Sequence, residues 1–186
     1  MDQTDSFAGR LLLALPGMRD DRFAHSVIAL CVHDANGALG ISVGEEMDGV
    51  SLHDLLRSFD LDGSRVPDRP VMRGGPVEPQ RGFVLHSLDW EGGDMLRVGA
   101  AWGLSGSLEI LKAIAENRGP ERYLVALGYA GWAAGQLEQE MAGDSWFLAE
   151  GDARLIFDAP TTDKWSAAFA ASGIDSNHLV SGAGTA

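Results

Sequence analysis

Apolar residues gather along the chain in short runs that predict β-strands. The runs "RLLLAL" at 10–15 and "SVIALCVH" at 26–33 are apolar at nearly every position, as expected for strands that are buried on both faces. Asn36-Gly37 follows the second run and indicates a tight hairpin, because both residues tolerate positive φ angles. Further strands are expected at 38–44, 71–74, 82–87, 95–100, 122–130, 145–150 and 154–159.

Other segments carry apolar residues at helical spacing, and they predict helices at 51–59, 107–117, 134–142 and 161–172. The first begins with Ser51, a residue type that caps helix N-termini. The residues of its core-facing stripe are Leu52, Leu55, Leu56 and Phe59. In the second helix, the residues expected to face the core are Leu108, Leu111 and Ala115. Hairpins interspersed with helices indicate a mixed α and β class.

The 186 residues contain no linker or repeat, which predicts a single domain over 10–175 between flexible tails at 1–9 and 176–186. The apolar run near the N-terminus is short and follows an acidic stretch, unlike a signal peptide. The apolar stretches elsewhere in the chain are also too short to span a bilayer. A lone cysteine, Cys31, rules out an internal disulfide and fits a reducing compartment. We therefore expect a cytoplasmic protein that does not contact membranes.

The chain is strongly acidic, and this changes which partners are expected. Its formal net charge is -13 and its pI is about 4.6. Proteins that bind DNA or RNA usually concentrate basic residues on one face, whereas the basic residues here are scattered along the chain. The charge therefore disfavours direct contact with nucleic acid.

The segment "VMRGGPVEPQRGFVLHS" at 71–87 is the first candidate site. Gly74-Gly75-Pro76 permits an unusual backbone path, and Arg73 with Arg81 could clamp a carboxylate or phosphate. The prolines remove N–H donors, however, and no helix follows to complete a phosphate cradle. We therefore favour a rigid strand–turn–strand element in which an arginine pairs internally with Glu78.

The segment "GYAGWAAGQLEQE" at 128–140 is the second candidate site. A strand, a glycine-rich turn and a helix start could bind an anion on free N–H groups. The glycine spacing is not that of a dinucleotide site, and Glu138 and Glu140 would repel phosphate. Trp132 and Gln136, which lie one turn apart, are expected to pack as part of the architecture.

Classical catalytic and metal-binding patterns are weak. Cys31 and His33 share a strand face at i and i+2, but a cysteine inside an apolar run is more often a core residue. His86 and Ser87 are strand neighbours, so they point to opposite faces and cannot pair directly. The histidines lack the spacing of a metal site. We expect no metal, no cofactor and no catalytic set.

The ordered motifs resemble the YqgE/AlgH family over roughly residues 10 to 175. They are "LLLALPGMRDDRFAHSVIALCVHDANGALGISV", the 71–87 segment, "RYLVALGYAGWAAGQLEQEM", "SWFLA" and "LIFDAPTTDKW". The resemblance implies a single-domain α+β fold, with a branched, mostly antiparallel β-sheet that includes a small barrel and is surrounded by helices. Family members have no established enzyme chemistry, and they are commonly labelled transcriptional regulators through an association with alginate control.

The candidate binding residues are Arg73, Gly74, Gly75, Arg81, His86, Tyr129, Gly131, Trp132 and Gln136. One departure from the family pattern is the acidic pair Glu45-Glu46, which stands where relatives carry asparagine, arginine and proline. If that loop binds an anion in relatives, the acidic pair disfavours such binding here.

Three functions follow from these observations. The leading hypothesis is a non-enzymatic regulatory or adaptor protein that binds a protein or a small ligand. The alternatives are a DNA-binding transcriptional regulator and a hydrolase with its site near residues 73–86.

Overall fold

Strand β9 (Tyr123–Ala133) organises the sheet in the computed structural model, which describes residues 6–181. The first half of β9 pairs antiparallel with β6 (Val77–His86) and parallel with β5 (Pro70–Arg73). Its second half pairs with β3 (Gly37–Ser42). Because β5 and β6 pair with the same stretch of β9, they lie along its two opposite edges. With β3, β9 therefore has three partner strands, and the sheet branches there.

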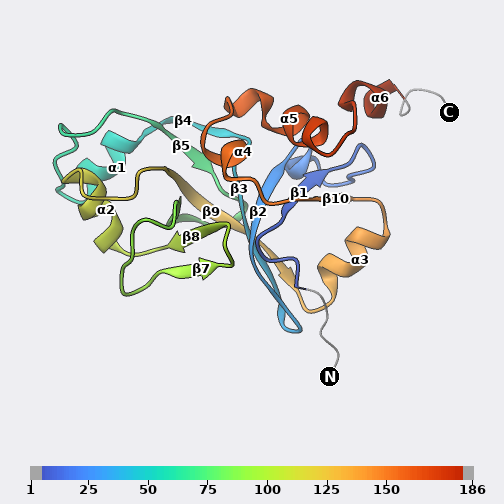
Figure 1. Cartoon of the computed structure of the whole chain (residues 1–186), viewed down its shortest axis with the longest axis horizontal. Coiled ribbons are helices and arrows are strands. Elements are labelled where there is room, and N and C mark those ends of the chain that lie inside the picture. Colours follow the sequence, from blue (N-terminus) through green and yellow to red (C-terminus); the bar gives the residue numbers. More distant parts are fainter. Residues whose placement is uncertain (1–5, 182–186) are drawn as a thin grey trace.

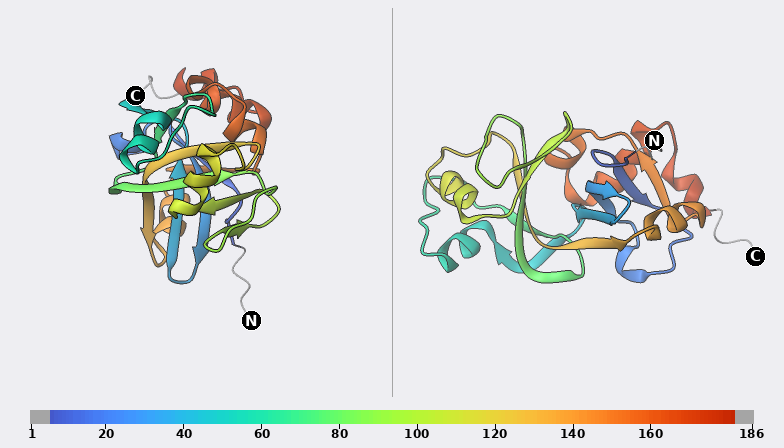
Figure 2. Two further views of the ribbon diagram at one scale, coloured as in Figure 1. Left: turned by 90° about the vertical axis from the view of Figure 1, so that its left-hand side faces the viewer. Right: turned by 90° about the horizontal axis from the view of Figure 1, so that it is seen from below.

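The strand order along the main path is β10-β1-β2-β3-β9-β6-β8-β7, and β4 pairs with β5 on the branch. Every pair is antiparallel except β5 with β9. The sheet curls into a half-barrel, and Figure 2 shows how strongly β6 bends along its length. The remaining strands are β1 (Leu11–Ala14), β2 (Val27–Asp34), β4 (Glu46–Ser51), β7 (Leu96–Val98), β8 (Trp102–Ser105) and β10 (Trp146–Ala149).

Helices cover the sheet in three places (Figure 1). They are α1 (Leu52–Ser58), α2 (Leu108–Ala115), α3 (Gln136–Ala142), α4 (Ala153–Phe157), α5 (Lys164–Ala171) and α6 (Ser176–Ser181). Short 3₁₀ turns lie at Asp21–Phe23 and Thr161–Asp163. One core fills the half-barrel beneath α4 and α5, a second lies under α1 and α2, and a third lies under α3. The expected single-domain α+β class with a branched, mostly antiparallel sheet is confirmed.

The expected elements differ from the structure in two places, and strand β4 and residues 77–81 of β6 were not predicted as strand. The strand expected at 154–159 is helix α4, in which the Asp152 side chain accepts a hydrogen bond from the Arg154 N–H and Ile156 is buried. A short apolar run is compatible with either a strand or a single helical turn. Here the helix cap at Asp152 favours the helix. The glycine-rich turn expected near residue 130 is wrong, because β9 continues to Ala133 through its pairing with β3.

The segments expected as tails contain ordered contacts. The Gly9 N–H donates to the Leu30 carbonyl at 2.8 Å, and the Phe7 N–H donates to His33 Nδ1 at 3.0 Å. The Phe7 ring stacks on the His33 ring at 4.7 Å between centroids. At the other end of the domain, residues 176–181 form α6. The rest of the expected tails, residues 1–5 and 182–186, lies outside the described residues.

Gly74-Gly75 carries the chain from β5 across β9 to β6. The Gly74 N–H donates to the Leu127 carbonyl at 2.8 Å. A Cβ atom at Gly74 would lie 2.2 Å from the carbonyl oxygen of Gly128, and one at Gly75 would lie 2.1 Å from the carbonyl carbon of Tyr129. The two backbones therefore pack at a distance that only glycine permits. These glycines shape a crossing of strands.

Gly75→Ala should destabilise the fold by about 3 kcal/mol or more, because the added methyl group overlaps backbone atoms that cannot move independently. Urea unfolding followed by circular dichroism measures the change. Gly93→Ala is the matched control, since a Cβ there meets only a side-chain oxygen at 3.8 Å. Equal midpoints for the two variants would contradict this account of the crossing.

Lys164 is a buried cation at the start of α5. Its side chain ties α5 to the end of β3, because Nζ donates to the Val43 carbonyl at 2.9 Å. The residue is 3 % exposed, and burial lowers the pKa of its ammonium group from 10.5 to about 8. Glu46 partly opposes that shift through its negative charge. The folded state therefore holds a proton on Lys164 less tightly than the unfolded chain does.

This difference predicts a rise in stability at alkaline pH. Between about pH 8 and pH 10.5 the unfolded chain binds more protons at this lysine, so the penalty for burying the charge, roughly 3 kcal/mol, is relieved as pH rises. Lys164→Met should lack this rise, whereas Lys112→Met, at the exposed second lysine, should retain it. Unfolding free energies across this range test the difference, and parallel curves for both variants would refute it.

Candidate functional site

The structure separates the residues of the first candidate segment. Arg73 pairs with Glu45, with Nε 3.2 Å from Oε1, and Arg81 pairs with Glu78, with Nη1 3.3 Å from Oε2. Arg73 lies two residues from Val71, which belongs to the core under α1 and α2. Since strand side chains alternate, Arg73 projects on that face, whereas Arg81 lies over the Phe83 ring on the other. The pair does not form a clamp.

Tyr129 joins Arg81 in a small surface cluster. Its ring packs edge-on against Phe83 at 5.8 Å between centroids. Burial raises the pKa of the Tyr129 hydroxyl, and a hydrogen bond to Glu78 adds to the rise. Glu78 thereby links the tyrosine to Arg81. The cluster is satisfied by its own members.

Trp132 and Gln136 belong to a carboxylate network that fixes α3. Glu140 Oε2 accepts hydrogen bonds from the indole N–H groups of Trp132 and Trp146, at 2.9 and 2.8 Å. Glu140 Oε1 accepts from the Gln136 amide at 3.0 Å. Gly131 lies beside the Tyr129 ring, and a Cβ at Gly131 would lie 3.4 Å from the nearest ring atom. The second candidate segment is therefore occupied by structural contacts, as in the architectural interpretation.

Cys31 and His33 do not share a face, so that expectation is wrong. A β-bulge between Leu30 and Val32 interrupts the alternation of β2. Cys31 lies in the core of the half-barrel, where burial raises the pKa of its thiol to about 12. His33 lies beside α3, with Nε2 2.6 Å from Glu138 Oε1.

His86 is fully buried and pairs with a serine that sequence reasoning did not single out. Its Nδ1 lies 2.8 Å from the Ser87 carbonyl, and its Nε2 lies 3.0 Å from Ser105 Oγ. The carbonyl can only accept, so the proton sits on Nδ1 and Nε2 accepts from the serine hydroxyl. Burial is the main cause that lowers the pKa of His86 and favours this neutral form.

A pocket of about 170 Å³ opens between α1, α2 and the sheet beside Ser105. We call it the α1–α2 pocket. It is lined by Leu55, Phe59, Gln80, Gly82, Phe83, Val84, Ser105, Gly106, Ser107, Leu108, Leu111, Val125 and Leu127. Three large apolar side chains are exposed in the described part of the chain, and two of them, Phe59 at 48 % and Leu108 at 40 %, lie on this pocket.

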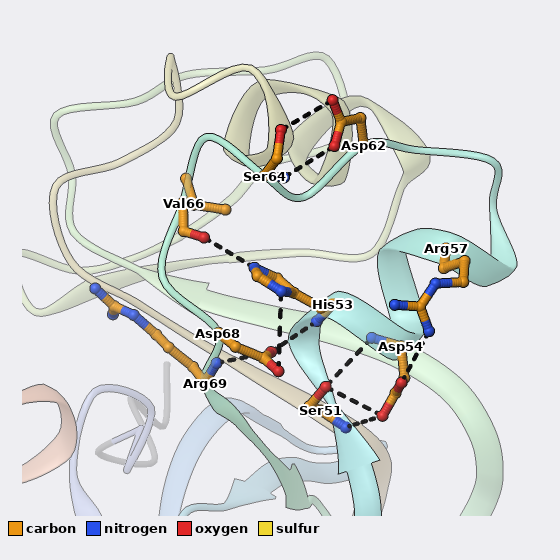
Figure 3. A network of polar contacts seen from close by, with 9 residues as sticks. All are labelled: Ser51, His53, Asp54, Arg57, Asp62, Ser64, Val66, Asp68 and Arg69. Carbon is orange, nitrogen blue, oxygen red and sulfur yellow. Dashed lines mark hydrogen bonds and ion pairs between the residues drawn. The ribbon is translucent and has the colours of Figure 1, made fainter.

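A polar network holds α1, one wall of the pocket, in place (Figure 3). Ser51 and Asp54 form a capping box at its N-terminus. Asp68, from the loop after α1, accepts from the backbone N–H groups of His53 and Arg69 at 2.8 and 3.0 Å. The His53 bond is the largest cause that lowers the pKa of the Asp68 carboxyl. The helix is therefore tied to the loop that follows it.

Sequence reasoning missed Phe59 and Leu108 as site residues, because both were assigned to the core. Each occupies a position in an apolar stripe at helical spacing. Phe59 ends α1 as its C-cap, and Leu108 begins α2, so neither is covered by a neighbouring element. Periodicity alone carries no signal for this, since it gives the face of a helix and not what covers that face.

Neither a metal centre nor a membrane span is found within residues 6–181. No three or more histidine, cysteine, aspartate or glutamate side chains gather there in a way that could hold an ion. None of the helices described combines the length and the apolar character needed to cross a bilayer.

Solved structures of other proteins share this fold. The structure is similar to the solution structure of the AlgH protein from Pseudomonas aeruginosa, with a TM-score of 0.80, 35 % identity and coverage of 100 % of this chain and 99 % of that one. It also shares its fold with protein DIP2367 from Corynebacterium diphtheriae, at a TM-score of 0.69 and 22 % identity, over 90 % of this chain and 87 % of that one.

Sequence relatives extend over the whole chain. A UPF0301 protein of Novosphingobium aromaticivorans is 52 % identical and one of Rhizorhabdus wittichii is 50 % identical, each over 100 % of both chains. The AlgH-like family model, DUF179, matches residues 11–177. The resemblance seen in the motifs is thereby confirmed: this chain belongs to the AlgH-like family of bacterial UPF0301 proteins.

Proposed function

We propose that this protein is a non-enzymatic binding protein, of a regulatory or adaptor kind, that holds one apolar side chain of a protein partner in the α1–α2 pocket. The observation that carries the proposal is the gathering of exposed apolar side chains there. Phe59 and Leu108 lie on the pocket, at the end of α1 and the start of α2. Exposed apolar surface around a hollow marks interaction sites, because water is a poor solvent for it.

The size of the pocket selects the group that enters it. Its volume of about 170 Å³ is close to that of a cavity of about 150 Å³ that holds benzene in another protein. An aromatic or branched aliphatic side chain fits that space. A free molecule of this size would leave the exposed parts of Phe59 and Leu108 uncovered, whereas the surface around an inserted side chain would cover both. A protein partner therefore fits better than a small ligand.

The charge distribution favours this function over direct DNA binding. A DNA-binding face needs basic side chains that are free to contact phosphates. Eight of the twelve arginines pair instead with carboxylates of this chain, and they are Arg10, Arg22, Arg57, Arg73, Arg81, Arg118, Arg122 and Arg154. With a net charge of -13, the chain repels a phosphate backbone at long range.

The arrangement around His86 gives less support to the hydrolase alternative. A serine–histidine pair needs backbone donors aimed at the developing oxyanion. The Gly106 N–H, which follows Ser105, is already bonded to Asp94 at 2.8 Å. Both His86 and Ser105 are at most 1 % exposed, and Arg73 and Arg81 lie elsewhere in ion pairs. These contacts favour a role for His86 in joining β6 to β8.

The cytoplasm is the location that we propose for this activity. The lone thiol is buried in the core, where it forms no disulfide. A chain without disulfides is suited to a reducing compartment.

N-Acetyl-phenylalaninamide, which carries the side chain that we expect to insert, should bind saturably in the pocket. In a ¹H–¹⁵N NMR titration, the shifted amides should be those of residues around the pocket, and N-acetyl-alaninamide should shift them far less. Gly82→Val should abolish the effect, because a Cβ at Gly82 meets only Leu127 at 3.8 Å and a larger side chain can extend into the pocket. Leu96→Ser, at the third exposed apolar residue, should leave it unchanged.

The same variants test the partner in cells. A photo-crosslinking residue at position 108 should capture a specific protein in the native bacterium, and the same residue at position 96 should not. Gly82→Val should remove that product. Binding of the phenylalanine probe that survives in Gly82→Val, or capture that is equal at both positions, would reject the proposal.

A further inference from the structure

A second cavity lies between the β4–β5 edge of the sheet, the start of β9 and the chain from α4 to α5. Its volume is about 140 Å³, and it shares only Val125 with the lining of the α1–α2 pocket. Nothing in the proposed function uses it. Its polar lining residues are Glu46, Arg69, Tyr123, Thr161 and Lys164.

Lys164 brings an incompletely satisfied cation to this cavity. An ammonium group has three N–H donors. Within residues 6–181 its one hydrogen-bond acceptor is the Val43 carbonyl, and no carboxylate lies within ion-pairing distance of it. Polar groups buried this deeply nearly always have partners. Two donors therefore remain for a group that enters the cavity.

Arg69 is a second cation without a carboxylate partner among the residues that the structure describes. Its Cζ lies 4.5 Å from the centroid of the Tyr123 ring, so the guanidinium packs on an aromatic face. Its backbone is fixed on both sides: the N–H bonds Asp68, and the carbonyl accepts from the Leu52 N–H at 2.8 Å. Figure 3 shows the side chain extending away from the network around α1. The Arg69 guanidinium, with its planar set of N–H donors, is thus fixed in position at the cavity.

The charges of the lining leave an excess of one positive charge. Lys164 and Arg69 are positive, and Glu46 is the one carboxylate among the described residues that line the cavity. Glu46 is also engaged, because its Oε1 accepts from the Thr161 hydroxyl at 3.0 Å. Glu46, which the sequence suggested would disfavour an anion in this loop, is therefore opposed by two positive charges. In a chain with a net charge of -13, this is a local reversal of sign.

We infer that this cavity binds a small monocarboxylate, with its carboxylate held by Lys164 and Arg69. A single negative charge balances the lining, and a carboxylate matches both the ammonium and the planar guanidinium as a hydrogen-bond acceptor. The volume is similar to that of a cavity that holds benzene, so the ligand has about six heavy atoms. Apolar lining residues such as Ile156 and Met72 suit a short aliphatic stem.

Thermal unfolding of the full chain tests this inference with sodium salts of acetate, butyrate, L-lactate and phosphate. Sodium chloride at matched ionic strength is the baseline, and isothermal titration then measures the affinity of the best ligand. At least one carboxylate should raise Tm saturably, because a ligand that binds only the folded state stabilises it by mass action. Arg69→Gln should weaken binding by about tenfold or more, and Lys164→Met should abolish it. Arg65→Gln, in the same loop but outside the lining, should bind normally.

Several results would overturn the inference. They are no Tm change beyond that of chloride, a response to phosphate without a response to any carboxylate, and carboxylate binding that Arg69→Gln leaves intact. Arg69 is exposed, so this variant is expected to fold and decides the question even if Lys164→Met does not fold. Gly82→Val should not affect carboxylate binding, which separates this cavity from the α1–α2 pocket.

Discussion

The close contact between the backbone at Gly74-Gly75 and that at Gly128-Tyr129 is the constraint on which the rest of the structure depends. It lets the chain cross from one edge of β9 to the other, so that β5 and β6 flank the same stretch of one strand. Because β9 pairs with three strands, β3, β5 and β6, the sheet branches at it. Residues of β5, β6 and β9 enter both the core beneath α4 and α5 and the core under α1 and α2. Gly74 and Gly75, which the sequence offered as part of a ligand-binding loop, instead make this crossing of strands possible.

The loop after α1 connects the two cavities. Asp68 holds the N-terminus of α1, whose far end carries Phe59 to the α1–α2 pocket. The same carboxylate bonds the backbone of Arg69, which lines the other cavity. One exposed aspartate thereby bonds the backbone of both the first turn of α1 and Arg69.

Apolar runs and turn residues predict most of the half-barrel correctly, because strands buried on both faces leave a clear pattern. They fail at 154–159, where one capping aspartate turns a short apolar run into α4, and at β2, where a bulge moves His33 to the face of α3. The candidate residues were chosen for their chemistry, and most are occupied by internal partners such as Glu78 and Glu140. The cavities could not be foreseen, since both are assembled from segments far apart in the chain.

The position of β9 and β10 late in the chain has a consequence for biosynthesis. β3, β5 and β6 are translated well before their shared partner at Tyr123–Ala133, and β1 waits for β10 at Trp146–Ala149. A ribosome-bound chain of about 120 residues therefore exposes unpaired strand edges, which are prone to aggregation. The half-barrel cannot close before β10 has been made, and until then the negative charge of the chain opposes association of its exposed strand edges.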